Sequence, residues 1–145
     1  MLNNFLIIGY IWLAFIAISF WESSVEGRNA WDKKKIGWKL RVGKYVVLTR
    51  YHFWVWVMMA LLLFFPLFIF GWNTRLFGVL LSAFASGWVI EDFFWYVVNP
   101  VVKVRELNTN FASYYPRISF GKVKIPVGYF IGIAVAILSW VIFWM

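Results

Sequence analysis

The amino-acid sequence predicts an all-α fold, an integral membrane four-helix bundle that forms one transmembrane domain over residues 1–145. Composition is the first reason: 63% of the residues are hydrophobic and 23% are aromatic, whereas soluble domains are about 45–50% apolar. The second reason is that the chain contains four long apolar segments, and a membrane helix needs about 20 such residues. The third is that Lys and Arg gather in two of the connections between these segments.

The first span is expected at residues 4–21, an apolar run that Glu22 brings to an end. A signal peptide is the competing interpretation, but its first residues carry positive charge, and residues 1–4 contain no Lys or Arg. The loop that follows, residues 22–50, contains eight Lys and Arg residues. Within it, residues 38–44 alternate apolar and basic side chains, a period that predicts a short strand or ribbon at the membrane surface.

The second span is expected at residues 51–70 and the third at residues 76–98. The second span contains Pro66, which membrane helices tolerate better than soluble helices do. The short connection between the two spans, 71–75, allows only an antiparallel return. The third span should end near Asn99, because a proline disfavours helical conformation at the residue before it.

A second basic loop is expected at residues 99–125, and it contains five Lys and Arg residues. Its last part, residues 119–125, alternates in the same way as the first loop, so we expect the two loops to form a short β-ribbon. Pro126 suits the first position of a helix. The fourth span is therefore expected at residues 126–144.

The distribution of positive charge predicts the orientation of the chain in the cell membrane. The 22–50 loop contains eight Lys and Arg residues, the 71–75 turn one, and the 99–125 loop five. Because connections rich in Lys and Arg stay in the cytoplasm, we expect both long loops inside and both termini outside. These loops also explain the net charge of +8, so no nucleic-acid partner is expected.

The first basic loop is also the expected site of contact with lipid headgroups. Basic side chains near a membrane surface attract anionic lipids by about 1 kcal/mol each. Orientation of the protein by the positive-inside rule alone is the competing explanation. The expected headgroup contacts are Lys33, Lys34, Lys35, Lys39, Arg41 and Lys44.

Two adjacent carboxylates, Glu91 and Asp92, lie within the third apolar segment. A charged side chain at the centre of a membrane costs roughly 2.5–3.5 kcal/mol on insertion scales, so such a residue usually has a partner or a function. On a helix, Asp92 lies on the same face as Tyr96 and Asn99. We therefore predict a buried polar or cation site near the cytoplasmic side, in which His52 of the second span joins these four residues.

A divalent metal ion is one occupant that this residue set would suit. Glu91, Asp92 and His52, with Glu22 or Asn99, supply hard oxygen ligands and one imidazole. The chain contains no Cys and one His, and no Lys lies deep in a span. Haem, iron–sulfur clusters and retinal are therefore not expected.

Two other roles for the carboxylates remain open. Intramembrane acids often serve in proton or ion pathways. Tyr96, Ser86 and Ser82 provide further polar side chains along the same helix, toward the outer side of the membrane. The outer half of the spans contains no further charged residue or His, which argues against a complete pathway within one chain. Alternatively, the carboxylates only hold the fold together by bonding to Arg50 or His52.

Small residues recur at every fourth position of the third and fourth spans. They let helices approach each other closely, either inside the bundle or against another subunit. The expected packing positions are Gly78, Ser82, Ser86, Gly128, Gly132 and Ala136.

The run from Glu91 to Pro100 reads Glu-Asp-x-x-Trp-Tyr-x-x-Asn-Pro, and Pro-Val-Gly-Tyr opens the last span. This pattern resembles that of small four-span membrane proteins of bacteria and archaea for which no activity is known. The resemblance implies the four-span architecture and the importance of Glu91, Asp92 and Asn99. Those proteins often have a His in the last loop, whereas this chain has none there, which argues against a metal ligand from that loop.

The sequence contains no phosphate-binding Gly-rich loop, no serine-hydrolase motif and no HExxH motif. We therefore expect a non-catalytic protein, a packing or accessory subunit of a homo-oligomer or of a larger membrane complex. Its expected partners are lipids and other membrane subunits. The alternative is a membrane enzyme, or an ion or proton transport component, that binds a cation or metal at Glu91, Asp92 and His52.

Overall fold

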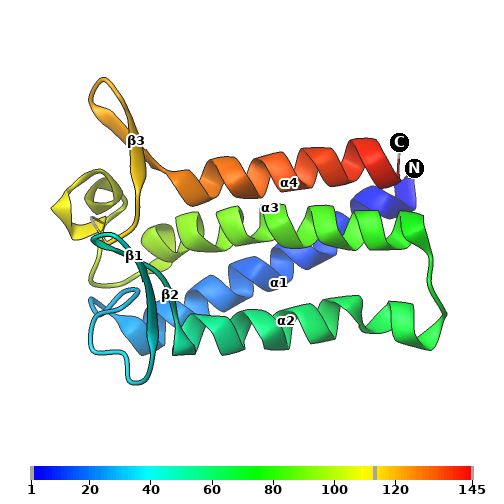
Figure 1. Cartoon of the computed structure of the whole chain (residues 1–145), viewed down its shortest axis with the longest axis horizontal. Coiled ribbons are helices and arrows are strands. Elements are labelled where there is room, and N and C mark those ends of the chain that lie inside the picture. The colour runs from blue at the N-terminus through cyan, green and yellow to red at the C-terminus, as the bar shows by residue number, and fades with distance from the viewer. Residues whose placement is uncertain (1, 113, 145) are drawn as a thin grey trace.

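The computed structural model describes residues 2–112 and 114–144, which are mostly helical and contain four α-helices and two β-hairpins (Figure 1). The elements in chain order are α1 (Leu2–Glu26), β1 (Lys39–Val42), β2 (Tyr45–Thr49), α2 (Arg50–Ile69), α3 (Thr74–Val98), the short 3-10 helices η1 (Val104–Asn108) and η2 (Asn110–Ala112), β3 (Arg117–Phe120), β4 (Val123–Pro126) and α4 (Val127–Phe143). Helices α1, α2 and α3 are long and apolar enough to cross a membrane, and α4 is apolar but shorter.

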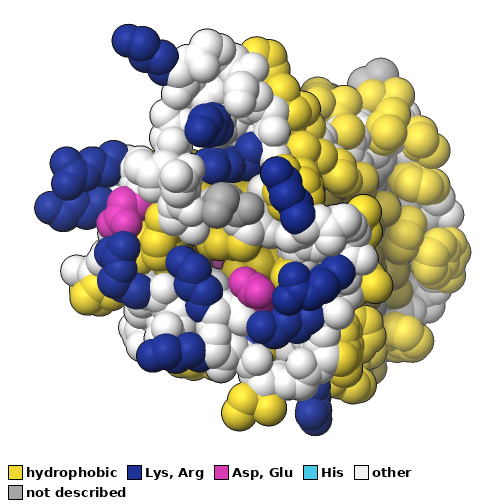
Figure 2. All heavy atoms as spheres, turned by 60° about the vertical axis from the view of Figure 1, so that its left-hand side comes forward, with side chains coloured by type: hydrophobic (Ala, Val, Ile, Leu, Met, Phe, Trp, Pro, Cys, Tyr) yellow, Lys and Arg dark blue, Asp and Glu magenta, His cyan; other side chains and the backbone are white. Residues whose placement is uncertain are grey.

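The two ends of the bundle differ in what they carry (Figure 1). Both chain termini and the connection between α2 and α3 lie at one end, which we call the terminal end. Both hairpins and both long loops lie at the other end, which we call the loop end. Figure 2 shows Lys and Arg side chains gathered over the loop end, while hydrophobic side chains cover the helices behind it.

Helix α1 is longer than predicted, and this corrects the expected start of the first loop at Glu22. The helix continues to Glu26, and Gly27, at φ +53°, adopts the left-handed conformation that often ends a helix. Glu22 and Glu26 face inward, with exposed fractions of 5% and 4%. Glu22 therefore does not end the helix, because its side chain points into the protein and not toward water.

The second and third helices begin and end close to their predicted limits, and their caps explain why. Thr49 precedes α2, and its side chain accepts a hydrogen bond from the backbone N–H of His52. Asn73 precedes α3, and its Oδ1 accepts a hydrogen bond from Leu76 N at 2.8 Å. At α4 the prediction shifts by one residue, because Pro126 ends strand β4 and caps the helix from outside.

Each alternating segment lies in a hairpin of its own, so the β-structure expected in the loops is present as two separate ribbons. Strand β1 pairs antiparallel with β2, and β3 pairs antiparallel with β4, in two separate two-stranded sheets. The hairpin turns fall inside the segments predicted as strands. Gly43 and Gly121 occupy these turns at φ +57° and +60°, which glycine adopts without steric cost.

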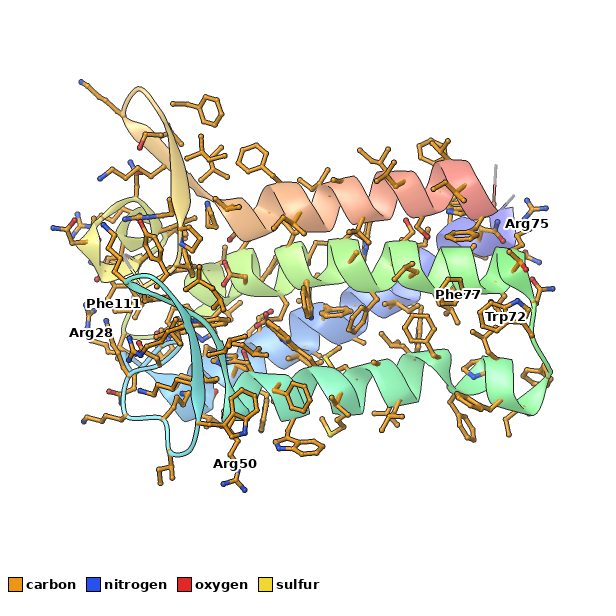
Figure 3. All side chains as sticks on the ribbon, in the orientation of Figure 1. Arg28, Arg50, Trp72, Arg75, Phe77 and Phe111 are labelled. Atoms are coloured by element: carbon orange, nitrogen blue, oxygen red, sulfur yellow. The ribbon has the colours of Figure 1, made fainter. Side chains whose placement is uncertain are left out.

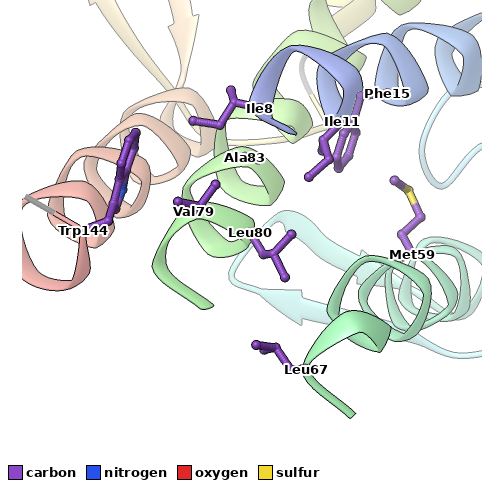
Figure 4. Packing of buried hydrophobic residues seen from close by; sticks show 9 residues of the cluster. All are labelled: Ile8, Ile11, Phe15, Met59, Leu67, Val79, Leu80, Ala83 and Trp144. Atoms are coloured by element: carbon purple, nitrogen blue, oxygen red, sulfur yellow. The ribbon is translucent and has the colours of Figure 1, made fainter. Parts of the chain in front are cut away.

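Helix α3 is the centre of the bundle, with α1 and α4 packed along it and α2 standing further away. Gly87 of α3 makes the approach of α1 so close that a Cβ atom there would overlap the ring of Phe15. Figure 4 shows the apolar core toward the terminal end, where side chains of α1, α2, α3 and the residue after α4 meet. The core residues are Ile8, Ile11, Phe15, Met59, Leu67, Val79, Leu80, Ala83 and Trp144.

Small residues of α3 and α4 form most of the contact between these two helices. Ser82 Oγ donates to the carbonyl of Ala136 at 3.0 Å, and Ser139 Oγ donates to the carbonyl of Gly78 at 2.8 Å. A Cβ atom at Gly132 would lie 2.9 Å from the carbonyl oxygen of Ala85. Four of the six predicted packing positions thus lie in the contact between α3 and α4.

The remaining two predicted packing positions behave differently. Ser86 turns to α1, where it accepts a hydrogen bond from Trp12 Nε1 at 2.9 Å. Gly128 packs against nothing, since no atom lies within 4 Å of a Cβ atom built there. Gly128 is therefore not used for helix packing within the described chain.

Candidate cation site

A cavity of about 540 Å³ lies toward the loop end of the bundle, lined by side chains from all four helices and from the loops. Four carboxylates line it: Glu22 and Glu26 from α1, and Glu91 and Asp92 from α3. The two pairs come from neighbouring helices that pack closely. The pair predicted from sequence is therefore half of a larger acidic group, and α1 supplies the other half.

Glu91 faces Glu22 across the contact between α3 and α1. Both side chains line the cavity. Among the described residues, no hydrogen-bond donor reaches the buried Oε1 atom of Glu91.

Asp92 faces α4, where its partner is a residue whose role the sequence did not reveal. Tyr129 Oη donates a hydrogen bond to Asp92 Oδ2 at 2.5 Å. Tyr129 stands in the first turn of α4, at the depth of Asp92 on the antiparallel α3. A phenol so near the start of an apolar helix was the signal that could have identified it.

Glu26, and not Glu91 or Asp92, has basic side chains close to it, those of Lys35 and His52. Its Oε1 lies 2.7 Å from Lys35 Nζ, and the two side chains are 3% and 13% exposed. His52 Nε2 lies 3.6 Å from the same oxygen. The other ring nitrogen of His52, Nδ1, is 2.7 Å from Thr49 Oγ1.

The structure does not join His52 to Glu91 and Asp92 as a metal site. Among the described residues, no three His, Asp or Glu side chains are placed to hold a metal ion together. Arg50 is not the partner of the carboxylates either. Its side chain points away from the helices (Figure 3) and lies against the backbone of Gly37.

Asn99 closes the loop end of α3 and does not take part in the acidic group. Its Nδ2 donates to the carbonyl of Gly27 at 2.9 Å, which ties α3 to the end of α1. Its Oδ1 accepts hydrogen bonds from the N–H groups of Val101 and Val102, both at 2.9 Å. Its role is therefore structural, as a cap that connects two chain segments.

Tyr96 belongs to a group of three phenols at the loop end. Its hydroxyl lies 3.0 Å from that of Tyr114 and 3.2 Å from that of Tyr115. Burial raises the pKa of Tyr114 and of Tyr115 well above the ordinary value of a tyrosine. Both hydroxyls therefore stay neutral and able to donate a hydrogen bond.

Aromatic rings form much of the remaining wall of the cavity. The Trp31 ring lies 4.2 Å from that of His52, and the Trp56 ring lies 4.0 Å from that of Trp88, measured between centroids. The indole N–H of Trp95, a residue only 4% exposed, has no acceptor. The aromatic lining residues are Trp31, Trp56, Phe84, Trp88, Trp95, Tyr114, Tyr115 and Tyr129.

Negative charge exceeds positive charge around the cavity. Among the described residues, Glu26 is the one lining carboxylate with a basic side chain within ion-pair distance. Glu22, Glu91 and Asp92 face the aromatic rings of the cavity and one another. Asp92 also accepts the hydrogen bond from Tyr129. Such a site, acidic and lined by aromatic faces, can stabilise a positively charged guest.

The lysines expected to contact lipid are largely engaged within the loops. Lys35, with a side chain 13% exposed, forms an ion pair with Glu26. Lys39 and Arg41 lie 3.6 Å and 3.9 Å from Asp32 Oδ2. The Nζ atom of Lys33 lies 4.1 Å from the centroid of the Phe111 ring.

Comparison with known proteins finds no matching family model, no matching curated protein and no matching solved structure. The resemblance to small four-span membrane proteins therefore stays a prediction from the sequence.

Proposed function

We propose that this chain is an integral membrane protein of four spans, with the terminal end outside the cell and the loop end in the cytoplasm. Three long apolar helices support this, as do the exposed apolar side chains along α2 and α4. With its 17 residues, α4 lies at the lower limit of about 17–25 residues for a span. The basic loops share one end of the bundle, as the positive-inside rule requires.

The orientation can be tested by cysteine labelling, because the chain contains no native Cys. A Lys34→Cys variant in intact cells should resist a membrane-impermeant thiol reagent. A Trp72→Cys variant, in the connection at the terminal end, should react with it. Labelling at residue 34 together with protection at residue 72 would contradict the proposed orientation.

Within that membrane protein, the cavity at the loop end binds an organic cation, an ammonium group, without catalysing a reaction. The carrying observation is that four carboxylates with one buried ammonium partner, Lys35, line a cavity walled by aromatic rings. A desolvated ammonium over aromatic faces gains roughly 2 kcal/mol or more. Pockets for small organic ligands have volumes of about 300–1,000 Å³, and the cavity, at about 540 Å³, lies within that range.

The geometry supports this occupant better than a metal ion or a proton pathway. A metal ion needs convergent ligands, and among the described residues no group of three is so placed. A proton pathway would have to cross the terminal half of the bundle. The core described there is built of Ile, Leu, Val, Phe and Ala side chains with Met59 and Trp144.

The test compares choline with 3,3-dimethyl-1-butanol, its uncharged isostere, on the purified protein in detergent. Binding is followed by tryptophan fluorescence, since four Trp residues line the cavity, and by calorimetry. We expect choline to bind about tenfold or more tightly than the alcohol, which corresponds to about 1.4 kcal/mol. Glu91→Gln and Asp92→Asn, which keep shape and remove charge, should each abolish that preference.

Two controls make this test decisive. Glu106→Gln removes a carboxylate of the loop surface, outside the cavity, and should leave choline binding unchanged. Mn²⁺ and Zn²⁺ titrations test the metal alternative with the same readout. Equal binding of choline and the alcohol, or unchanged binding in both cavity variants, would refute the cation site.

Assembly with itself or with other subunits remains a second proposal from the sequence. Most of the small residues that suggested it are occupied in the contact between α3 and α4. The apolar side chains exposed on α2 and α4 leave room for either lipid or a partner. The mass of the protein purified in mild detergent, measured by light scattering, decides between a monomer and an assembly.

A further inference from the structure

Two segments at the loop end form part of the cavity wall, and each is fixed by a hydrogen bond. Val127 N donates to the carbonyl of Pro116 at 3.0 Å, which holds the 114–116 segment near the start of α4. Trp31 Nε1 donates to the carbonyl of Val46 at 2.6 Å, which holds the first loop against β2. Both segments contribute lining residues.

In the lateral direction, the cavity extends to the gap between α2 and α4. Helix α2 contributes Trp56 to the lining and α4 contributes a row of apolar residues, yet these two helices have no extensive contact with each other. Ile131 lines the cavity and is also 60% exposed on the outer surface. A lining residue that is also exposed marks the mouth of the cavity.

Gly128 lies at this mouth, and this position accounts for the absence of a side chain there. It lines the cavity, and no atom lies within 4 Å of a Cβ atom built at its position. Its missing side chain therefore widens the opening instead of allowing helices to pack. Gly132, one turn further along α4, does pack against the backbone of α3, so the two glycines have different roles.

The lining is polar at one end of the cavity and apolar at the other. The carboxylates of α3 are at residues 91 and 92, and the lining continues along that helix to Leu81. At 1.5 Å per residue, this distance is about 15 Å. Phe84, Ala85 and Val135 line the apolar part. A small cation would occupy the acidic end alone and leave the apolar part in contact with water.

From this arrangement we infer that the occupant is an amphiphile with a cationic ammonium head and a long apolar chain, which enters sideways from the bilayer between α2 and α4. Its head lies against Glu22, Glu91 and Asp92, and its chain extends along the apolar part beside Phe84, Ala85 and Val135. A phosphate in the head would face these carboxylates, so zwitterionic phospholipids do not fit. The inference rests on the proposed cation site and adds to it the ligand class and the route of entry.

The test modifies the mouth after the protein has folded. Gly128→Cys introduces the sole thiol of the chain, and alkylation of the purified variant with N-phenylmaleimide fills the opening. Gly9→Cys, treated in the same way, is the matched control, because Gly9 also has no atom within 4 Å of a built Cβ. The probes are dodecyltrimethylammonium, at low mole fraction in dodecyl maltoside micelles, and choline. Binding is read from tryptophan fluorescence and from the shift in melting temperature.

We expect dodecyltrimethylammonium to bind at least tenfold more tightly than choline to the unmodified protein. Alkylation at residue 128 should weaken both probes at least tenfold, because both reach the carboxylates through this mouth. Alkylation at residue 9 should change neither. Glu91→Gln should weaken both probes, because both place an ammonium at the carboxylates.

The outcomes separate this inference from the cation site on which it rests. If choline binds as tightly as the long-chain probe, or if alkylation at residue 128 affects neither, the lateral amphiphile is wrong and the cation site stands. If neither probe depends on Glu91, the cation site itself is wrong. A change of molecular mass upon alkylation at residue 128, with both ligands unaffected, would assign the mouth to a subunit contact and overturn the inference.

Discussion

The two halves of the helix bundle are held together by different interactions, although the same helices pass through both. In the terminal half, apolar side chains of α1 and α3 meet directly, and Gly87 with Phe15 is a point of close contact between the two helices. In the loop half, the same two helices present carboxylates to each other and to a cavity. Hydrogen bonds, the ion pair of Lys35 with Glu26 and contacts between aromatic rings connect the elements there.

This difference shows where the chain is built for packing and where it is built for a site. The terminal half packs apolar side chains together. The loop half keeps a cavity, and two of its lining residues have polar atoms, Glu91 Oε1 and Trp95 Nε1, that lack a partner among the described residues. Buried polar atoms without partners cost free energy unless something else satisfies them. Changes in the loop half should therefore be severe where they remove a partner, and changes in the terminal half severe where they add volume.

The largest effect is expected from Lys35→Met, which leaves Glu26 buried without its cation. Breaking a buried ion pair by removing one partner costs about 3–5 kcal/mol, and both side chains are largely buried here. The measurement is the melting temperature in detergent, followed by tryptophan fluorescence. Lys34→Met, at an exposed neighbouring position, is the control. Adding Glu26→Gln to Lys35→Met should restore most of the loss, and a double variant no more stable than Lys35→Met would contradict the ion-pair explanation.

A smaller effect is expected from Gly87→Ala in the terminal half. The added methyl group would overlap the ring of Phe15, which is fully buried, and overfilling a packed interior costs about 1–3 kcal/mol. The same substitution at Gly9, where the surroundings are open, should be neutral or slightly stabilising. Equal melting temperatures for the two variants would show that α1 and α3 do not approach each other as closely as described.

The smallest effect is expected from Glu106→Gln at the surface of the loop end. Arg28 donates two hydrogen bonds to Glu106, at 2.7 Å and 3.2 Å, and Figure 3 shows Arg28 beside Phe111 at this end. The hydrogen bond from Arg28 lowers the pKa of Glu106 below its ordinary value of 4.5. Because the folded-state pKa is the lower one, this stabilisation is present above the ordinary value and is lost as the pH falls through the folded-state pKa.

The corresponding measurement compares wild-type protein and Glu106→Gln across pH. The small difference in melting temperature at neutral pH should disappear under acidic conditions and should shrink at high salt, since exposed charges are screened. A difference that stays constant down to acidic pH would mean that the glutamate acts through shape and not through charge.

The sequence alone was sufficient for the helices and for the two ends of the bundle. Apolar segments of this length indicate helices with only small errors in their limits, because capping side chains at Thr49 and Asn73 and the proline after Asn99 define the ends locally. The distribution of Lys and Arg likewise identified the two basic loops. These features depend on residues close together in the chain, which is why a linear pattern contains them.

Only the tertiary structure decided which residues form the site. Glu22 was predicted to end a helix and instead lies opposite Glu91, His52 lies beside Glu26, and Tyr129 was not identified as the partner of Asp92. Helix α2 is apolar on all sides, so no polar face marks how it is rotated or how far it stands from α3. The rotation and spacing of helices depend on contacts such as that of Gly87 with Phe15, between residues distant in sequence, and no local pattern contains them.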